Sequence, residues 1–399
     1  MADAPAPKPI TQAIPVAPAA LTASTALGEM KIPENLKEIE KLMVAATRNK
    51  ASDLHLKTGQ KPILRVNTVI HEIGSRALVG DDVKRLIYEI MTEIQRDRFE
   101  TEHDLDFAYS IPGVGRFRIN VFQERGSVAV AMRRVNTSIP SFADLNLPPD
   151  TKKICEYEQG LIIVAGPTGS GKSTTLACIL DHINATQKAH MVTIEDPIEY
   201  LFTDKKSFVN QREIGIDVPD FHQALKHVVR QDPDVILVGE MRDYVSFDAA
   251  LMASETGHLV FATIHASSAP QCIGRLLDLF PTERQPLIRQ SLAFNLKAIL
   301  CQRLLPSCKE GIKMVPAVEV LFNNSTAQKL IMNAEDKKLS DLIRSCKEEG
   351  MQDFNLSMVD LINKGLVTKK VALQYSPNPE QLKMNLQGIY LGDDHKILG

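Results

Sequence analysis

The sequence predicts an α/β protein in which an N-terminal α+β domain is followed by a larger domain built on a mostly parallel sheet. Residues 31–136 alternate between helix-like and strand-like segments, which indicates the α+β domain. Between residues 151 and 265, four short apolar runs alternate with helical segments, as in a parallel sheet covered by helices. From Leu287 onward the apolar spacing is mostly helical, so we expect C-terminal helices after the sheet.

The composition argues against several classes of protein. The chain has 399 residues, 44% of them hydrophobic, and its net charge of −3 gives no support for direct nucleic-acid binding. The six cysteines form no C-x-x-C pair, so we expect reduced thiols rather than disulfides or a metal site. No run approaches the ~18 apolar residues that suggest a membrane-spanning helix.

Changes in composition predict the domain boundaries. Pro15 and Pro18 interrupt the alanine-rich N-terminus, which favours a disordered tail over a secretion signal. A later proline-rich stretch has the composition of an interdomain linker, and the last residues are polar. We therefore expect a tail at 1–30, an N-terminal domain at 31–136, a linker at 137–150, a second domain with a C-terminal helical part at 151–380 and a tail at 381–399.

The N-terminal domain shows both periodicities. Apolar residues at helical spacing predict one helix near 36–46 and a second over 83–94. A Pro-Gly pair at 112–113 marks a turn between two strands. Alternating polar and apolar residues predict strands over 52–56, 62–73, 106–111, 115–122 and 127–135.

Arginines cluster on neighbouring strands of this domain. Alternation places Arg116, Arg118 and Asn120 on one side of a strand. The cluster is either a solvated strand face or a set of charges delivered to a nucleotide phosphate in another subunit, as an arginine finger. Its members are Arg116, Arg118, Arg125, Arg133 and Arg134.

The second domain contains the phosphate-binding loop G-x-x-x-x-G-K-[ST] of P-loop NTPases. A buried strand, 161–164, precedes the loop and a helix from Thr174 to His182 follows it, which is the context this motif requires. Its glycines let backbone N–H groups wrap around phosphate oxygens, Lys172 places a charge at the β- and γ-phosphates, and the Ser173 hydroxyl is a Mg²⁺ ligand. We expect ATP to contact Gly166, Pro167, Thr168, Gly169, Ser170, Gly171, Lys172, Ser173 and Thr174.

Acidic residues follow the next predicted strand, 191–194. Glu195, Asp196 and Glu199 lie at its carboxyl end, and ligands of open α/β sheets bind at that edge. Each of them taken singly is explained equally well as an acidic loop residue in water. The three together favour a role in positioning Mg²⁺ and water.

Two further predicted strands end in ionisable residues. The run 234–240 is a Walker B-type strand that ends in Glu240, our candidate for the catalytic acid that holds Mg²⁺ through water or polarises the attacking water. Asp234, at its start, is a structural residue in this interpretation. The run 257–265 ends in His265, which is either a hydrogen-bonded structural histidine or a sensor that contacts Glu240 or a γ-phosphate.

The apolar spacing in the C-terminal part predicts a series of helices. Leu292, Leu296, Ile299 and Leu300 share one apolar helical face. Two later helices, 339–346 and 354–362, are closed by glycines at 350 and 365, and residues from about 376 are polar.

Taken jointly, the motifs resemble the secretion ATPase superfamily and, within it, the type IV pilus retraction ATPases of the PilT/PilU kind. The resemblance covers roughly residues 34–380. It rests on the P-loop, an acidic "Asp box", a Walker B strand and a "His box" behind a PAS-like domain. The segments are Ser52–His55, Gly115–Arg118, Gly166–Thr175, Thr193–Glu199, Val209–Glu213, Asp232–Asp243, Glu255–Val260, Thr263–His265 and Gly350–Gln352.

The resemblance implies an α/β chain with a PAS-like N-terminal domain and a RecA-like ATPase domain with C-terminal helices, in a homohexameric ring. It implies a cytoplasmic motor at the inner membrane that hydrolyses ATP with Mg²⁺ and acts on a pilus platform protein to drive retraction and twitching motility. Ser173 and Glu240 would hold the metal. Catalysis would fall to Glu199, Glu240, His265 (paired with His258), Arg118 and Arg133, with Arg116 and Arg275 beside the nucleotide.

Departures from the family pattern leave alternatives open. The chain lacks the tetracysteine insertion of extension and type II secretion ATPases, which favours the retraction branch. The family's Ala-Ile-Arg-Asn-Leu-Ile-Arg-Glu motif is replaced by Ser325–Ile331, without either arginine, and Ser291–Ile299 is closer to the PilU-type paralogue. The alternatives are a nucleotide-binding accessory subunit that joins a paralogous motor, or another secretion or DNA-uptake ATPase.

Overall fold

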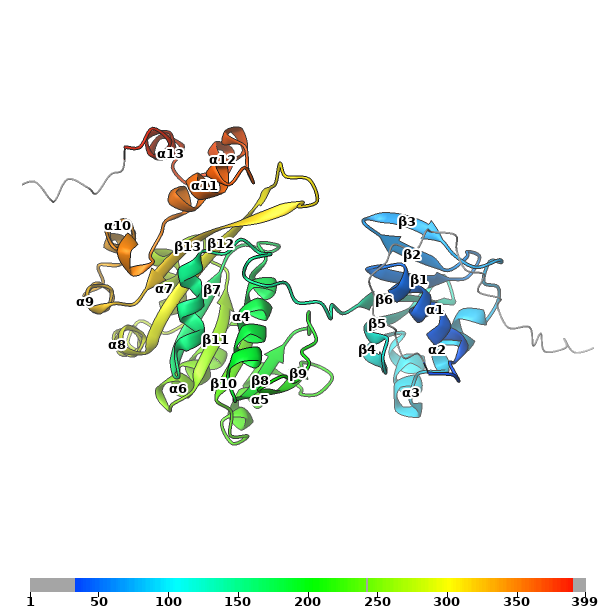
Figure 1. Cartoon of the computed structure of the whole chain (residues 1–399). Helices are drawn as coiled ribbons and strands as arrows, with labels where there is room; N and C mark the ends of the chain where they lie inside the picture. Colours follow the sequence, from blue (N-terminus) through cyan, green and yellow to red (C-terminus); the bar gives the residue numbers. More distant parts are fainter. Residues whose placement is uncertain (1–32, 242, 390–399) are drawn as a thin grey trace, which may run out of the picture. The chain divides into compact units, whose positions relative to one another are not determined.

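The computed structural model describes residues 33–241 and 243–389 (Figure 1). The chain divides into two compact units, with the boundary between Thr137 and Ser138. Among the described residues, no helix combines the length and the apolar character needed to cross a bilayer. The tail expected at residues 1–30 lies outside the described part.

The first unit is built on a six-stranded antiparallel sheet with strand order β3-β2-β1-β6-β5-β4. Leu54, Met132, Ile119 and Phe107 lie side by side across four strands and are buried, so they form a row of the core. The elements are α1 Glu38–Arg48, β1 Asp53–Lys57, β2 Ile63–Val66, β3 Val69–Glu72, α2 Asp82–Tyr88, α3 Glu93–Glu102, β4 Asp104–Ile111, β5 Gly115–Glu124 and β6 Ser127–Arg134.

The single helix predicted over 83–94 is wrong, because the chain makes two helices there. α2 ends at Tyr88 and α3 starts at Glu93. Thr92 caps α3: its hydroxyl accepts from the Gln95 N–H at 3.3 Å, and the Gln95 side chain accepts from the Thr92 N–H at 2.9 Å. Ile94, counted as part of the apolar face, is 80% exposed. The capping box outweighs the continued apolar spacing.

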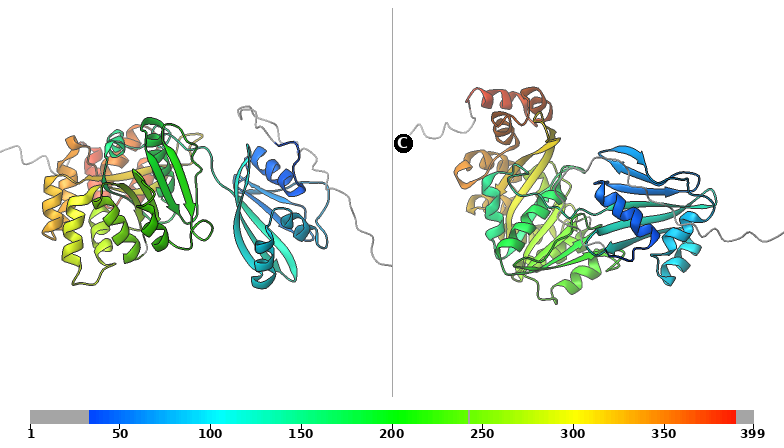
Figure 2. Two further views of the ribbon diagram at one scale, coloured as in Figure 1. Left: turned by 90° about the horizontal axis from the view of Figure 1, so that it is seen from below. Right: turned by 45° about the vertical axis from the view of Figure 1, so that its right-hand side comes forward.

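The second unit contains a seven-stranded sheet of order β13-β12-β7-β11-β10-β8-β9 with helices packed on it (Figure 2). All neighbouring strands are parallel except β12 and β13. Every residue of β7 and β11 is buried, so both faces of these strands are covered. The strands are β7 Gly160–Ala165, β8 His190–Glu195, β9 Phe208–Glu213, β10 Val235–Glu240, β11 Leu259–Ile264, β12 Leu296–Pro306 and β13 Met314–Phe322; the helices among them are α4 Lys172–Thr186, α5 Phe221–Val228, α6 Tyr244–Glu255, α7 Ala269–Leu277 and α8 Gln285–Asn295.

The prediction that the chain is mostly helical from Leu287 is wrong for the segment after α8. Leu296, Ile299 and Leu300 belong to β12, which pairs with β7 on one side and with β13 on the other. All three side chains are buried. A short apolar run does not distinguish a buried strand from a buried helix. Here the segment forms a strand because its backbone pairs with the edge of β7.

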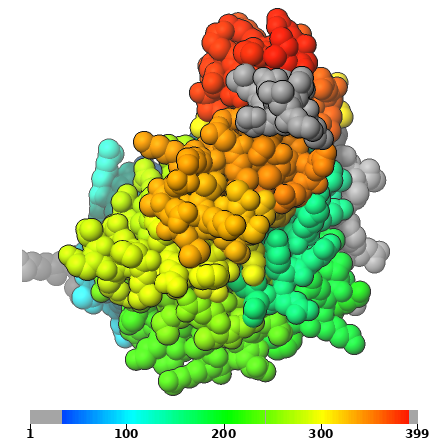
Figure 3. Space-filling model, turned by 90° about the vertical axis from the view of Figure 1, so that its left-hand side faces the viewer, coloured from blue at the N-terminus to red at the C-terminus, as the bar shows by residue number. Residues whose placement is uncertain are grey.

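Helices follow the β12–β13 hairpin and cover one end of the second unit (Figure 3). The helices predicted over 339–346 and 354–362 are confirmed as α10 and α11. The polar stretch from about 376 includes a helix, α13, which extends into the tail expected at 381–399, and Leu382 of this helix is buried. These helices are α9 Ser325–Met332, α10 Leu339–Ser345, α11 Phe354–Asn363, α12 Lys369–Tyr375 and α13 Pro379–Leu386.

A buried carboxyl group on β13 caps helix α7. Glu319 is only 7% exposed and accepts a hydrogen bond from the backbone N–H of Ala269, the first residue of α7, at 2.8 Å. A negative charge at a helix N-terminus is favourable. Burial nevertheless raises the pKa of Glu319 to about 7, and the nearby Asp353 carboxylate adds to the rise.

Replacing Glu319 by glutamine should change the pH dependence of stability. Because the pKa of Glu319 is raised from 4.5 to about 7, the folded chain binds more protons than the unfolded chain between these values, so stability falls as pH rises through this window. Glu319→Gln keeps an oxygen acceptor for Ala269 and cannot titrate. From pH 5 to pH 8 the wild type should lose about 2 kcal/mol of unfolding free energy relative to the variant. Urea unfolding of both proteins at several pH values measures this difference. If the unfolding free energies of the two proteins change equally with pH, the raised pKa of Glu319 is contradicted.

Candidate functional site

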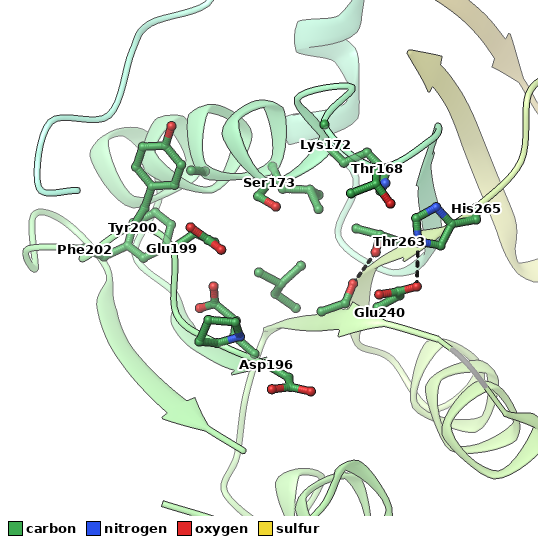
Figure 4. A pocket seen from close by; sticks show the side chains of 17 residues that line it. Thr168, Lys172, Ser173, Asp196, Glu199, Tyr200, Phe202, Glu240, Thr263 and His265 are labelled. Carbon is green, nitrogen blue, oxygen red and sulfur yellow. Dashed lines mark hydrogen bonds and ion pairs between the residues drawn. The ribbon is translucent and has the colours of Figure 1, made fainter. Parts of the chain in front are cut away.

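A cavity of about 550 Å³ lies at the carboxyl ends of the parallel strands, beside the start of α4 (Figure 4). Parallel strands end at the same edge of a sheet, so segments far apart in the sequence meet there. The cavity brings together all three predicted catalytic residues of the second unit and several of its other predicted site residues. Those that line it are Thr168, Gly169, Lys172, Ser173, Glu195, Asp196, Glu199, Glu240 and His265.

The P-loop joins β7 to α4 and depends on glycine at two close approaches. Gly166 has φ +157°, and a Cβ there would lie 2.4 Å from the Ser170 Oγ. Gly171, directly before α4, has a left-handed φ of +89°. Larger residues would displace the loop, whose backbone N–H groups and helix N-terminus form an anion site. Five of the predicted loop residues are not among those that line the cavity: Gly166, Pro167, Ser170, Gly171 and Thr174.

Lys172 is the first residue of α4 and is partly buried. Its Nζ donates to the carbonyl oxygens of Gly166 at 2.8 Å and Pro167 at 3.2 Å. Burial lowers the pKa of Lys172, and the charge of Glu240 opposes this shift. A partly desolvated ammonium attracts a phosphate more strongly than one in water, whereas the Glu240 carboxylate repels it unless a cation lies between them.

Glu240 and His265 form a pair across neighbouring strands. The Nε2 of His265 lies 2.8 Å from the Oε1 of Glu240. Glu240 ends β10, and His265 directly follows β11. Thr263 donates from its hydroxyl to the Gly239 carbonyl oxygen, which ties the two strand ends together (Figure 4). The contact with Glu240 is the one expected of a sensor, and it is equally the hydrogen bond of a structural histidine.

Of the three carboxylates at the end of β8, Glu195 is the last residue of the strand and is partly buried, whereas Asp196 and Glu199 follow it and are exposed. All three line the cavity. Burial raises the pKa of Glu195 to about 7, and the charge of Glu199 adds to the rise. The hydroxyl of Thr193 at 2.7 Å and the amide of Gln211 at 3.2 Å donate to Glu195 and oppose the shift. Glu195 is therefore a carboxyl that changes charge near neutral pH.

Tyr200 and Gln211 stabilise the loop after β8 at this edge of the sheet, and the sequence analysis did not identify them. The Tyr200 hydroxyl lies 2.9 Å from the Thr174 Oγ1, which connects the loop after β8 to α4. Gln211 on β9 donates to the Tyr200 carbonyl oxygen at 2.8 Å and accepts from the Phe202 N–H at 2.9 Å. Its position inside the Val209–Glu213 segment was the only available signal.

Two predicted residues lie away from the cavity. His258 precedes β11, at the end opposite His265, and its Nδ1 contacts the Ala253 carbonyl oxygen at 2.9 Å. Arg275 lies on α7, exposed, and does not line the cavity. His258 and His265, the two histidines of the His box, therefore lie at opposite ends of β11.

Three of the five predicted arginines, Arg116, Arg118 and Arg133, form a row on one face of the first unit's sheet. Arg125 lies in the turn between β5 and β6, and Arg134 lies opposite the buried Phe117, on the other face. Arg118 on β5 lies opposite Arg133 on β6, and Arg133 lies opposite Asp53 on β1. The Nε of Arg133 is 2.9 Å from the Asp53 Oδ1. Arg116 lies two residues before Arg118 and shares its face. The three arginines therefore lie on one face of the sheet, and the Asp53 carboxylate orients one of them, Arg133.

The comparisons with known proteins agree with one another. The type II/IV secretion system protein family matches residues 32–364. The chain is 38% identical to the type IV pilus retraction ATPase PilT of Pseudomonas aeruginosa, over 86% of this chain and 99% of that protein. It is 36% identical to the type IV pilus ATPase PilU of the same organism, over 88% and 91%. A crystal structure of the pilus retraction motor PilT with bound ADP superposes with a TM-score of 0.79 at 42% identity, over 88% of this chain and 99% of that one.

The pKa of Glu195 predicts proton uptake when a polyanion binds. Because the pKa of Glu195 is about 7, added negative charge in the cavity should raise it further and draw a proton from solvent. At pH 7 we expect ATP binding to take up on the order of half a proton. Calorimetry in buffers of different ionisation enthalpy measures this quantity.

The controls separate Glu195 from other groups. Glu195→Gln should abolish the uptake. Glu319→Gln should leave it unchanged, because Glu319 has a similarly raised pKa but does not line the cavity. Undiminished uptake in Glu195→Gln would assign the proton to another group and refute this prediction.

Proposed function

The chain belongs to the type II/IV secretion system protein family, and on that premise we propose that it is an ATP-hydrolysing motor of type IV pilus retraction. The observation that carries the proposal is the pair of Glu240 and His265, which shares one cavity with Lys172 and Ser173. A nucleotide-binding protein without turnover needs the P-loop and has no use for a histidine-oriented carboxylate beside it.

The geometry supports a division of roles within the cavity. The N-terminus of α4 and Lys172 bind the phosphates. The Ser173 hydroxyl and, through water, Glu240 would hold Mg²⁺, which supplies charge neutralisation at the β- and γ-phosphates when it is bound. Glu240 orients the attacking water and accepts its proton. The N–H of His265 Nε2 fixes the orientation of Glu240, and Glu199 provides a second carboxylate on the cavity wall.

The donor set fits Mg²⁺. Among the described residues no group of three or more His, Cys, Asp or Glu side chains forms a ready metal cluster. Mg²⁺ bound with nucleotide needs only one or two protein ligands, because phosphates and waters complete its coordination shell. A hydroxyl at the start of α4 and a carboxylate on the same cavity meet that requirement.

The assembly we propose is a homohexameric ring in which each site is completed by a neighbour. Arg116, Arg118 and Arg133 of one subunit would contact the phosphates held by the next, and their alignment on one sheet face supports this role. Arg275 is proposed to lie near the nucleotide in the same assembly. We place the ring at the cytoplasmic face of the inner membrane, where it would act on a pilus platform protein.

The second candidate function is that of an accessory subunit in a mixed ring with a paralogous motor. The altered segment 325–331 favours it. This segment forms α9, where Ala327 and Ile331 are buried and Lys329 is the single charged side chain among its eight residues. The two arginines of the retraction motif are thus absent from an ordered helix, and their loss alters what this helix presents to a partner.

Glu240→Gln should bind ATP and lose turnover by at least about 100-fold, because it removes the acceptor for the proton of water. Steady-state MgATP hydrolysis and the mass of the assembly are measured on the same samples. Lys172→Ala serves as the control that loses binding itself. A wild-type ring that hydrolyses ATP no faster than Glu240→Gln would favour the accessory function over the motor.

Mixing two inactive variants tests the arginines in trans. Arg118→Glu keeps an intact P-loop, and Lys172→Ala keeps an intact arginine row. If Arg118 acts on a neighbour's nucleotide, random mixed rings should regain activity at about a quarter of their interfaces. Arg98→Glu is the matched control, because Arg98 on α3 is exposed and pairs only locally with Glu102. Absence of any complementation, in rings shown to be mixed by mass, would place Arg118 outside the neighbouring site.

A further inference from the structure

Gln302 connects the P-loop to helix α4, and we propose that it is a positioning residue for nucleotide binding. It lies on β12, one residue beyond the last residue that pairs with β7. Its Nε2 donates to the Ser170 carbonyl oxygen at 2.7 Å, and its Oε1 accepts from the Thr175 hydroxyl at 2.8 Å. One side chain therefore joins the end of the loop to the first turn of the helix.

The side-chain amide of Gln302 is shielded from solvent. Gln302 is 2% exposed and Thr175 is 1% exposed. In such an environment a lost hydrogen bond leaves a buried polar group unpaired, which costs more than the bond itself contributes. The two bonds also fix which way the amide faces, because the hydroxyl donates to its oxygen and the carbonyl accepts from its nitrogen.

Gln302 also lies against the glycines at both ends of the loop. A Cβ on Gly166 would lie 2.5 Å from the Gln302 carbonyl oxygen, and a Cβ on Gly171 would lie 2.7 Å from its Nε2. The loop thus closes around Gln302. The Ser170 carbonyl oxygen accepts a hydrogen bond from the Gln302 amide, and Ser170 does not line the cavity.

The consequence for binding follows from preorganisation. A glycine-rich loop has many accessible conformations, and apparent affinity falls in proportion to the fraction of molecules in the competent one. Gln302 raises that fraction without touching the ligand. Its loss should therefore raise the Kd and KM for nucleotide and leave kcat nearly unchanged. This inference rests on the proposed function only in taking nucleotide as the ligand of the P-loop.

The experiment measures MgADP affinity by calorimetry, KM and kcat for ATP, and the midpoint of thermal unfolding. Thr175→Val is isosteric, and Gln302→Leu replaces the amide by a slightly smaller apolar side chain. Each breaks the connection, so each should weaken MgADP binding by about tenfold. The double variant should be hardly weaker than either single one, because both remove the same connection. Thr175→Ser retains the hydroxyl and should bind nearly as the wild type does.

Gln352→Leu is the matched control for a lost glutamine hydrogen bond. Gln352 donates to the Val318 carbonyl oxygen at 2.8 Å, next to β13, and does not contact the P-loop. It should lower the unfolding midpoint and leave the Kd unchanged. Thr175→Val keeps the test decisive even if Gln302→Leu fails to fold.

Three results would overturn the proposal: wild-type affinity in Thr175→Val and Gln302→Leu, independent additive losses in the double variant, or an equal loss of affinity in Gln352→Leu. A wild type that binds no MgADP would refute the proposed function itself, and is thereby distinguished from failure of the Gln302 inference alone.

Discussion

The structure depends on the parallel pairing of β7, β11, β10 and β8. Parallel strands finish at one edge of the sheet, so the P-loop, His265, Glu240 and Glu195 are delivered to one cavity although they span about a hundred residues of sequence. The register has one irregularity, between Val238 and Glu240, directly beside the pair that Glu240 makes with His265. Pairing and its local interruption together determine the geometry of the site.

Burial then determines how the charges at this edge behave. Lys172 is desolvated close to Glu240, and Glu195 has a pKa of about 7 because it is buried near Glu199. These costs oppose folding and are characteristic of a site whose groups are arranged for a charged ligand. Burial raises the pKa of Glu319 in the same way, although Glu319 caps α7 and does not line the cavity. A raised pKa identifies a function only when a cavity accompanies it.

The sequence by itself determined the parts of the protein whose chemistry is local. The spacing Gly166–Ser173 requires a loop that closes on phosphate, and strand, loop and helix appear where that motif needs them. Glu240 and His265 could be predicted because each ends an apolar strand, and strand ends meet at one edge. The two-unit α/β fold could also be predicted, because hydrophobic spacing is local and indicates which face of each helix or strand is buried.

Only the tertiary structure decided the features that need a distant partner. Leu296–Pro306 becomes a strand because β7 and β13 offer backbone hydrogen bonds on both sides, which apolar spacing does not reveal. His258 and His265 resemble a pair in sequence, yet β11 holds them at opposite ends. Gln302 could not be connected with the P-loop, because its role arises from contacts across more than a hundred residues with Ser170 and Thr175. Local motifs state which chemistry is available, and long-range packing decides which groups hold that chemistry in place.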